Sequence, residues 1–355
     1  MRAVVVTRDR DRPHVRELPR PEPGPGEALV RILRVGIDGT DHEVIAGGHG
    51  GYPEGADHLV LGHEAVGVVA DPNGTDLAAG DLVVPTVRRP APGAPTAFFD
   101  RGEPDMAPAG QYVERGIAGA HGFMAEYVTS PAEFLVPVPE SMARTGFLIE
   151  PISNVEKALA LARASRSAFE WTPTAGMVLG NGPLGLLALG LLTTEGIERT
   201  YCLGRRDRPD PTIAIAERLG ATYVDSREHA LRAIPDAHEP MDLVIEATGH
   251  APHAFETVAL LAPNGVGALL GIPGDDRVRL DAGRLHRELV LSNKALVGSV
   301  NSSVPHFEAA IDTLAAVPDW LPERLITHTF EPAAVADAFA PDDDRIKAVI
   351  EFGTR

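Results

Sequence analysis

The chain has 355 residues and a single cysteine, Cys202, which lies in an apolar stretch. One cysteine cannot form a disulfide within its own chain, and it cannot build a zinc site from cysteine thiolates. Neither an internal disulfide nor a zinc site of cysteine thiolates can therefore stabilise this fold. We expect Cys202 to be a buried filler, because a lone thiol among apolar neighbours packs as a small hydrophobic group.

Lysine is almost as scarce as cysteine. Only Lys157, Lys294 and Lys347 are present, against 50 acidic residues, and the formal net charge is −18. Such a surface repels nucleic acids and anionic lipids, so neither is an expected partner. An acidic, lysine-poor surface suits a cytoplasm with molar salt, which screens the repulsion among carboxylates. The alternative is the bias of a GC-rich genome, which also replaces lysine by arginine.

Long apolar runs are missing as well. No stretch approaches the roughly 18 to 20 residues of a membrane helix. The longest candidate, residues 184–192, contains Gly185 and Gly190. The first apolar run ends at Arg8 and Asp9, which is typical of a strand and not of a signal peptide. The length favours two domains, and a hydrophobic fraction of 44% supports ordinary cores. We expect a soluble, cytoplasmic protein.

The first part of the chain is dominated by strand patterns. Residues 1–90 predict short strands separated by turns, which indicates a β-rich, barrel-like unit. Residues 86–122 lack periodicity and form a long excursion, and loops of this length are usually functional or mobile. Residues 123–128 return to a strand pattern, and residues 154–169 have the spacing of a helix.

Between residues 176 and 300, predicted strands alternate with predicted helices. This alternation is typical of a parallel, doubly wound sheet, so the fold class is α/β with an additional β-rich domain. A last apolar run, residues 345–351, is expected to rejoin the N-terminal unit. The expected domains are therefore residues 1–156, completed by residues 306–355, and residues 157–305.

The stretch that leads to Glu64 carries groups that can hold a divalent metal. Asp38, His63 and Glu64 occur there, and Glu150 follows later in the chain. Zinc accepts imidazole nitrogen and carboxylate oxygen, and three protein ligands plus water make a catalytic site. Adjacent residues of an extended segment point to opposite sides, so either His63 or Glu64 is expected to lie outside the direct ligand set. We predict Asp38, His63 and Glu150 as direct ligands, with Glu64 close behind.

A second interpretation of these residues stays open. Asp38 can instead cap a turn or a helix, and His63 can be a buried histidine whose hydrogen bonds are satisfied. The spacing alone does not decide between the two interpretations.

A nucleotide-binding pattern follows from residue 180. The residues Gly180-Asn181-Gly182-Pro183-Leu184-Gly185 form a G-x-G-x-x-G motif between an apolar strand and an apolar helix, as the motif requires. The glycines allow close approach of the backbone, and the helix N-terminus attracts a pyrophosphate.

The choice of cofactor depends on the residue about 20 positions further on, where an NAD site carries an acid that binds the ribose hydroxyls. This chain instead has Arg205 and Arg206, and two guanidiniums suit a 2′-phosphate. NADP is therefore favoured. The main alternative is that the protein uses NAD as well as NADP. The other alternative is that Arg205 and Arg206 are a solvated pair in a loop.

These residues together resemble the medium-chain zinc-dependent dehydrogenases over the whole chain. Gly62-His63-Glu64 matches the zinc motif of that family, and the dinucleotide loop lies where the family has it. Within the family the chain is most similar to the glucose 1-dehydrogenases of the salt-adapted archaeal type. The supporting stretches include residues 38–43, 61–67, 150–153, 204–207 and 298–302. The resemblance implies a GroES-like catalytic domain and a Rossmann domain.

Two departures from the wider family concern zinc. The family has cysteine where Asp38 stands, although this subgroup has aspartate, and an oxygen ligand holds zinc less tightly than a thiolate. The four-cysteine lobe that binds structural zinc in the family belongs in residues 86–120, which contain no cysteine. We therefore expect one catalytic zinc and no structural zinc.

The resemblance also implies an activity, a set of site residues and an assembly. The activity is oxidation of D-glucose and related aldoses at C1 to the aldonolactone, with hydride transfer to NADP; a polyol or alcohol dehydrogenase and a catalytically silent NADP-binding relative are the alternatives. Catalytic roles are implied for Thr40, Glu64 and Glu150. Sugar contacts are implied for Thr40, Glu114, Glu150 and Asn301. Cofactor contacts are implied for Gly180, Asn181, Gly182, Pro183, Leu184, Gly185, Arg205, Arg206, Leu270, Gly271, Ile272, Ser299, Val300 and Asn301. A homo-oligomer, dimer or tetramer, is implied as well.

Transfer from molar salt to dilute buffer is predicted to inactivate the protein and to promote its unfolding. The reason is that repulsion among 50 carboxylates is then no longer screened. The midpoint of urea unfolding and the residual activity, both measured in the two solutions, check this. Equal stability in the two solutions would indicate that the acidic, lysine-poor composition results from genomic bias.

Overall fold

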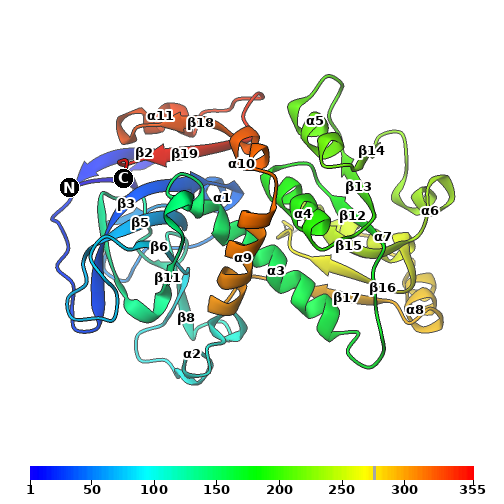
Figure 1. The fold of residues 1–355 in the computed structure, drawn as a ribbon, viewed down its shortest axis with the longest axis horizontal. Coiled ribbons are helices and arrows are strands. Elements are labelled where there is room, and N and C mark those ends of the chain that lie inside the picture. Colours follow the sequence, from blue (N-terminus) through cyan, green and yellow to red (C-terminus); the bar gives the residue numbers. More distant parts are fainter. Residues whose placement is uncertain (275–276) are drawn as a thin grey trace. The chain divides into compact units, whose positions relative to one another are not determined.

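The computed structural model describes residues 1–274 and 277–355. The chain forms two compact units, whose elements are labelled in Figure 1. The first unit comprises Met1–Ser153, Asn301–Leu314 and Pro322–Arg355, and the second comprises Asn154–Val300 and Ala315–Leu321. None of the described helices is long and apolar enough to cross a membrane.

The first unit is built mainly from antiparallel strands. Its largest sheet has seven strands in the order β11-β6-β5-β3-β19-β18, with β10 also paired to β3. Two smaller sheets have the orders β2-β1-β4 and β7-β8-β9. The strands are β1 Arg2–Thr7, β2 Arg10–Glu17, β3 Glu27–Ile37, β4 His58–Val60, β5 Glu64–Asp71, β6 Leu82–Pro85, β7 Arg88–Pro90, β8 Tyr112–Arg115, β9 Gly119–Ala120, β10 Tyr127–Pro131, β11 Leu135–Pro137, β18 Ile326–Phe330 and β19 Lys347–Glu351. The helices α1 Gly39–Ile45, α2 Ala97–Asp100 and α11 Val335–Ala338 accompany them.

The core of the first unit lies along β1, β3 and β5, which are almost entirely buried. These strands consist largely of valine, isoleucine, leucine and alanine, and near-continuous apolar runs are typical of strands covered on both faces. β19 pairs antiparallel with β3, so that Val349 lies opposite Gly36. The expectation that residues 345–351 rejoin the N-terminal unit is therefore confirmed.

Residues 86–122 contain more regular structure than their sequence pattern predicts. They hold β7, α2, β8, β9 and a 3-10 turn at Pro104–Met106. The buried side chain of Arg88 organises this segment: its Nε donates to Glu114 Oε1 at 3.0 Å, its Nη1 donates to the carbonyl of Asp105 at 2.9 Å, and its guanidinium lies 3.7 Å from the centre of the Tyr112 ring. Sequence periodicity could not reveal this order, because the paired strands are short and Arg88 bonds to residues that are 26 and 17 positions away.

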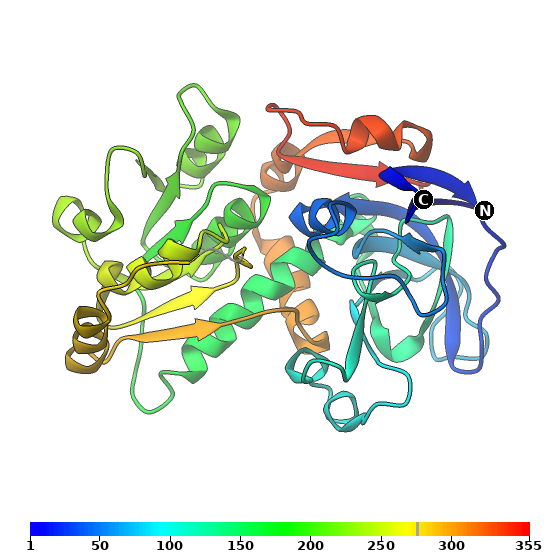
Figure 2. The same ribbon diagram turned by 180° about the vertical axis from the view of Figure 1, so that it is seen from behind.

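The second unit is a six-stranded parallel sheet in the order β14-β13-β12-β15-β16-β17. Figure 2 shows it from behind. Its strands are β12 Ala175–Leu179, β13 Arg199–Gly204, β14 Thr222–Asp225, β15 Met241–Glu246, β16 Leu261–Leu269 and β17 Ala295–Gly298. Its helices are α4 Pro183–Thr194, α5 Pro211–Arg218, α6 Ile234–Ala237, α7 Ala251–Leu260 and α8 Ala282–Leu291. The predicted doubly wound sheet is confirmed. Three helices have residues in both units: α3 Ile149–Ala164, α9 Val304–Ala316 and α10 Trp320–Leu325.

Several predicted boundaries are wrong. The helix predicted at residues 154–169 begins at Ile149 and ends at Ala164, because Pro151 is tolerated in the first turn of a helix. The strand predicted at residues 123–128 begins only at Tyr127. Helix α1 was not predicted, although Asp38 before it is a favourable capping residue.

The three lysines occupy the interior. Lys157 and Lys347 are each 3% exposed, and the side chain of Lys294 is 9% exposed. Each Nζ has a protein partner: Val300 carbonyl at 2.9 Å for Lys157, Glu64 for Lys347 and Val258 carbonyl at 2.8 Å for Lys294. The surface is therefore free of lysine, and its positive charges are carried by arginine.

Candidate metal centre and cofactor pocket

Asp38 lies between β3 and α1, where it caps the helix. Its Oδ1 accepts a hydrogen bond from the backbone N–H of Asp41 at 3.0 Å, and Asp41 Oδ2 accepts one from the N–H of Asp38 at 3.1 Å. This reciprocal pair is a capping box. Asp41 Oδ1 also accepts from the N–H of Gly62 at 3.2 Å, so Asp41 ties α1 to the segment before β5. The sequence analysis missed Asp41, although an acid three residues after a capping residue is the signal of this motif.

Capping uses only one oxygen of Asp38, and the other faces His63. The distance from Asp38 Oδ2 to His63 Nε2 is 3.4 Å. Ligand atoms of Asp38, Asp41 and His63 lie within 4.8 Å of one another, and so do ligand atoms of His63, Glu64 and Glu150. His63 belongs to both groups, which together contain four carboxylates and one imidazole. The structure therefore brings together all four predicted metal ligands and adds Asp41.

His63 and Glu64 both contribute to this cluster, so the expectation that they point to opposite sides is wrong. The chain turns at Gly62, whose φ is 84°, and β5 begins only at Glu64. Side chains alternate between the two faces of a strand only from Glu64 onward, so this rule does not apply to His63. The pattern of apolar and polar residues in the sequence does not reveal a turn one residue before the strand.

Glu64 also forms a buried ion pair with Lys347. The Lys347 Nζ lies 2.7 Å from Glu64 Oε1 and 2.5 Å from Oε2, and both side chains are 2% exposed. Gly36 lies opposite Glu64 in the β3–β5 pairing, and a Cβ at residue 36 would approach Glu64 Oε2 to 2.1 Å. A glycine is needed there to make room for the carboxylate. The sequence analysis missed Lys347, which is 283 residues away in the chain.

The ionisation of the cluster reflects burial and mutual attraction. Burial raises the pKa of Asp41 to about 7, and the charge of Asp38 adds to this. Burial also raises the pKa of Glu64, against the opposing charge of Lys347. For Asp38, burial disfavours the charged form, but the charge of His63 outweighs it and lowers the pKa. The same attraction overcomes burial at His63 and raises its pKa.

This centre fits a zinc ion. Four carboxylates surround only one imidazole and one ammonium, and a divalent cation neutralises such a buried surplus of negative charge. Carboxylate oxygen and imidazole nitrogen are zinc ligands, and the metal would displace the proton of His63. His63 Nδ1 is buried and has no hydrogen-bond partner within the described part of the chain, whereas Nε2 faces Asp38. Of the two ring nitrogens, Nε2 is therefore the one that faces another predicted ligand.

The predicted sugar-binding residues lie on separate elements of the first unit. Thr40 is the second residue of α1 and is partly buried. Glu114 lies on β8, where Arg88 holds its carboxylate. Asn301 has a left-handed backbone with φ of 58°, and its Oδ1 accepts from the N–H of Ser302 at 2.9 Å.

The glycine motif occupies the turn between β12 and α4 in the second unit. Gly180 has a φ of 114°, which favours glycine. A Cβ at Gly185 would lie 2.0 Å from the Gly180 carbonyl, so only glycine lets the helix pack there. A Cβ at Gly182 would meet nothing within 4 Å, which leaves open space for a ligand above the backbone. These are the three roles that a dinucleotide-binding loop needs.

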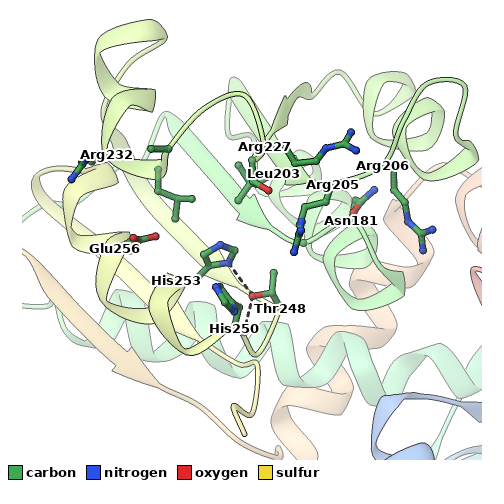
Figure 3. A pocket seen from close by; sticks show the side chains of 15 residues that line it. Asn181, Leu203, Arg205, Arg206, Arg227, Arg232, Thr248, His250, His253 and Glu256 are labelled. Carbon is green, nitrogen blue, oxygen red and sulfur yellow. Dashed lines mark hydrogen bonds between the residues drawn. The ribbon is translucent and has the colours of Figure 1, made fainter. Parts of the chain in front are cut away.

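A cavity of about 970 Å³ opens beside this turn (Figure 3). It is lined by Gly180, Asn181, Leu203, Gly204, Arg205, Arg206, Ser226, Arg227, Ala230, Leu231, Arg232, Thr248, His250, His253 and Glu256. The predicted cofactor residues Gly180, Asn181, Arg205 and Arg206 are among them. The lining does not include Gly182, Pro183, Leu184, Gly185, Leu270, Gly271, Ile272, Ser299, Val300 or Asn301. Thr248, His250 and His253 were missed, although they follow directly after a predicted strand of a parallel sheet, where ligands bind.

Arg205 and Arg206 differ from Arg208 and Arg227 beside them. Arg227 forms ion pairs with Asp225 at 2.6 Å and Asp207 at 2.7 Å, and Arg208 forms one with Glu217 at 2.5 Å. Within the described residues, the guanidiniums of Arg205 and Arg206 have no hydrogen bond and no ion pair. Two exposed cations left unpaired on so acidic a chain are available to a phosphate.

Two family models match the chain. The model described as alcohol dehydrogenase GroES-like domain matches residues 24–140. The model described as glucose dehydrogenase C-terminus matches residues 143–352.

The chain is also similar to curated proteins over its whole length. It is 61% identical over 356 residues to the glucose 1-dehydrogenase of Haloferax mediterranei, with 100% of each chain covered. It is 59% identical over 352 residues to the glucose 1-dehydrogenase of Haloarcula marismortui, with 99% of each covered. Among solved structures it resembles Haloferax mediterranei glucose dehydrogenase in complex with NADP, Zn and gluconolactone, with a TM-score of 0.97, 61% identity and 100% of both chains covered.

Replacing Asp38 tests whether it is a metal ligand as well as a helix cap. Asp38→Asn keeps an oxygen that can accept from Asp41 N–H but removes the negative charge that faces His63. We predict that zinc affinity falls at least about ten-fold. Asp38→Cys supplies a thiolate, which binds zinc more tightly, and should resist EDTA better than the wild type. Zinc content and the EDTA concentration that halves it are the measurements.

Asp210 provides the matched control, because it caps α5 and its carboxylate accepts from the N–H groups of Thr212 and Ile213. Asp210→Asn should leave zinc content unchanged. If Asp38→Asn also retains wild-type zinc content and chelator sensitivity, Asp38 is a cap only.

Proposed function

The chain belongs to the glucose 1-dehydrogenases of the medium-chain zinc-dependent dehydrogenase family, and on that premise we propose that it oxidises D-glucose and related aldoses at C1. The product is the aldonolactone, and the hydride passes to NADP. The observation that carries this proposal is the match to a relative solved with NADP, Zn and gluconolactone, at 61% identity over the full length of both chains. The metal cluster and the unpaired arginines of this chain suit the same ligands.

We assign the metal to Asp38, His63 and Glu150, with Glu64 beside them. When bound, zinc acts as a Lewis acid that lowers the pKa of a coordinated hydroxyl. Lys347 on β19 neutralises Glu64 on β5, and β3 lies between these two strands in the sheet. The choice of Glu150 over Glu64 as a direct ligand is supported by this ion pair, because both Glu64 oxygens already face an ammonium.

The chain's other polar groups would position the sugar. Thr40 is the second residue of α1, two positions after Asp38, and its hydroxyl is suited to receive the proton of the C1 hydroxyl and pass it on. Glu114 and Asn301 would accept hydrogen bonds from the remaining hydroxyls. Arg88 fixes the Glu114 carboxylate before substrate binds, which lowers the entropic cost of binding.

The cofactor would bind along the motif turn and the cavity of the second unit. NADP, when bound, supplies the nicotinamide that accepts the hydride. Gly180, Gly182 and the N-terminus of α4 would hold the pyrophosphate, and Arg205 and Arg206 the 2′-phosphate. Pro183, Leu184, Leu270, Gly271, Ile272, Ser299 and Val300 are further proposed contacts.

The roles of the domains, the assembly and the location are also proposed. We assign catalysis to residues 1–156 with 306–355, and NADP binding to residues 157–305. A homo-oligomer is supported by β17, an edge strand of the parallel sheet, and by nearby Val290 and Leu291, which are 61% and 76% exposed. The acidic, lysine-free surface supports a cytoplasm rich in salt.

A substrate panel with NADP and zinc tests the proposed activity. Glucose should give the highest kcat/KM, and gluconolactone should be the first product. A higher kcat/KM for a simple alcohol or a polyol would replace the sugar assignment. Bound NADP without metal and without turnover of any substrate would identify a catalytically silent relative.

The arginine pair makes a separate prediction about cofactor choice. The double variant Arg205→Ala/Arg206→Ala should raise the KM for NADP at least about 100-fold, since each charge-assisted phosphate contact contributes roughly 1.5 to 3 kcal/mol. The KM for NAD should change little. Arg208→Ala is the matched control, because Arg208 is exposed but paired with Glu217 and does not line the cavity. Equal weakening of both cofactors would contradict the assignment of the 2′-phosphate.

A further inference from the structure

A chain of hydrogen bonds runs along the wall of the cavity, from the end of β15 to the start of α7 (Figure 3). Glu246 is the last residue of β15 and is buried. Its Oε1 accepts the backbone N–H of Thr248 at 2.7 Å and also the hydroxyl of Thr248. The Thr248 Oγ1 in turn accepts the N–H of His250 at 3.0 Å and lies 3.1 Å from His253 Nδ1.

These contacts determine the tautomer of His253. The hydroxyl of Thr248 donates its single proton to Glu246 Oε1. The Thr248 oxygen is then an acceptor toward His253, and the proton of the neutral ring must be on Nδ1. Burial lowers the pKa of His253 to about 4, and the charges of His250 and Arg205 act in the same direction. The ring is therefore neutral near pH 7, and Nε2 carries a free lone pair.

The side chains around His253 are both apolar and charged. The same cavity is lined by Leu203, Ala230 and Leu231 and by Arg232 and Glu256. His250 supports the ring of His253 from the side, with 4.7 Å between the ring centres and an angle of 81°. A lone pair on nitrogen repels phosphate oxygens, which the unpaired guanidiniums of Arg205 and Arg206 attract instead.

We propose that His253 is a specificity-determining residue that recognises the base of the cofactor, by accepting a hydrogen bond from the 6-amino group of adenine at Nε2. The proposal rests on the proposed use of NADP and adds base recognition to it. Adenine presents an amino donor at position 6, whereas hypoxanthine presents a carbonyl acceptor there. The Glu246–Thr248 pair keeps Nδ1 protonated and thereby keeps Nε2 an acceptor, so Thr248 is a positioning residue for this contact.

The test compares NADPH with its hypoxanthine counterpart, in which the 6-amino group is replaced by oxygen. Dissociation constants are measured from the nicotinamide fluorescence on the zinc-loaded protein in molar salt. The wild type should bind NADPH at least about ten-fold more tightly than the hypoxanthine form, because two facing acceptors leave both groups without a hydrogen bond. His253→Phe keeps an aromatic ring but has no acceptor, and the two dissociation constants should then agree within about two-fold.

Two further variants separate recognition from packing. Thr248→Val removes the group that orients the tautomer, so the preference for adenine should decrease while the protein stays folded. His250→Phe keeps the ring packing against His253 and should leave the ratio of the two dissociation constants unchanged, whatever its effect on each. A loss of thermal stability alone would not change this ratio in any variant.

The inference fails if the wild type binds both coenzymes equally, or if His253→Phe retains the preference. Failure to bind either coenzyme overturns the inference together with the NADP assignment. Selective binding without oxidation of glucose supports the inference and overturns only the proposed substrate. The two ideas are therefore distinguishable in one set of titrations.

Discussion

The grouping of four carboxylates, three of them buried, around one imidazole is the constraint on which the first unit depends. Asp38, Asp41, Glu64 and Glu150 approach His63 from separate parts of the chain. Lys347 compensates one of these charges, and a divalent cation would compensate much of the rest. The surrounding backbone serves this arrangement: Gly36 makes room for Glu64, and the capping box of α1 fixes the orientation of Asp38. A cluster of this kind is costly without its metal and is correspondingly selective for a small, highly charged ion.

In the second unit the constraint is the opposite one, because positive charge has to stay available on an acidic chain. On a chain with a net charge of −18, Arg208 and Arg227 near the cavity are paired with acids. Arg205 and Arg206 form no ion pair within the described residues, which keeps their positive potential for an incoming anion. Beside them, Glu246 does not neutralise a cation but orients Thr248 and, through it, His253. The cavity therefore offers guanidiniums for phosphate and, at His253, a hydrogen-bond acceptor for a base.

The scarcity of lysine has a structural counterpart in both units. Lys157, Lys294 and Lys347 are retained where an ammonium is enclosed by carbonyl or carboxylate oxygens. At these places a compact point charge on a flexible stem fits where a planar guanidinium does not. The exposed positions carry acids and arginine. Lysine therefore occurs where packing requires an ammonium, and the composition of the surface, which suits a salty solvent, is set by acids and arginine.

The amino-acid sequence by itself determined the parallel sheet, the glycine turn and the arginine pair. These features depend on local periodicity or on residues adjacent in the chain, and local patterns are what a sequence displays directly. Only the tertiary structure decided which groups join them. Lys347 reaches Glu64 across 283 positions because β19 pairs with β3, and β3 pairs with β5. Thr248 and His253 meet the arginine pair because β13 and β15 flank β12 in the sheet, so that distant segments end at the same edge. Strand order and register are set by the packing of the whole unit, and for that reason no short stretch of sequence contains them.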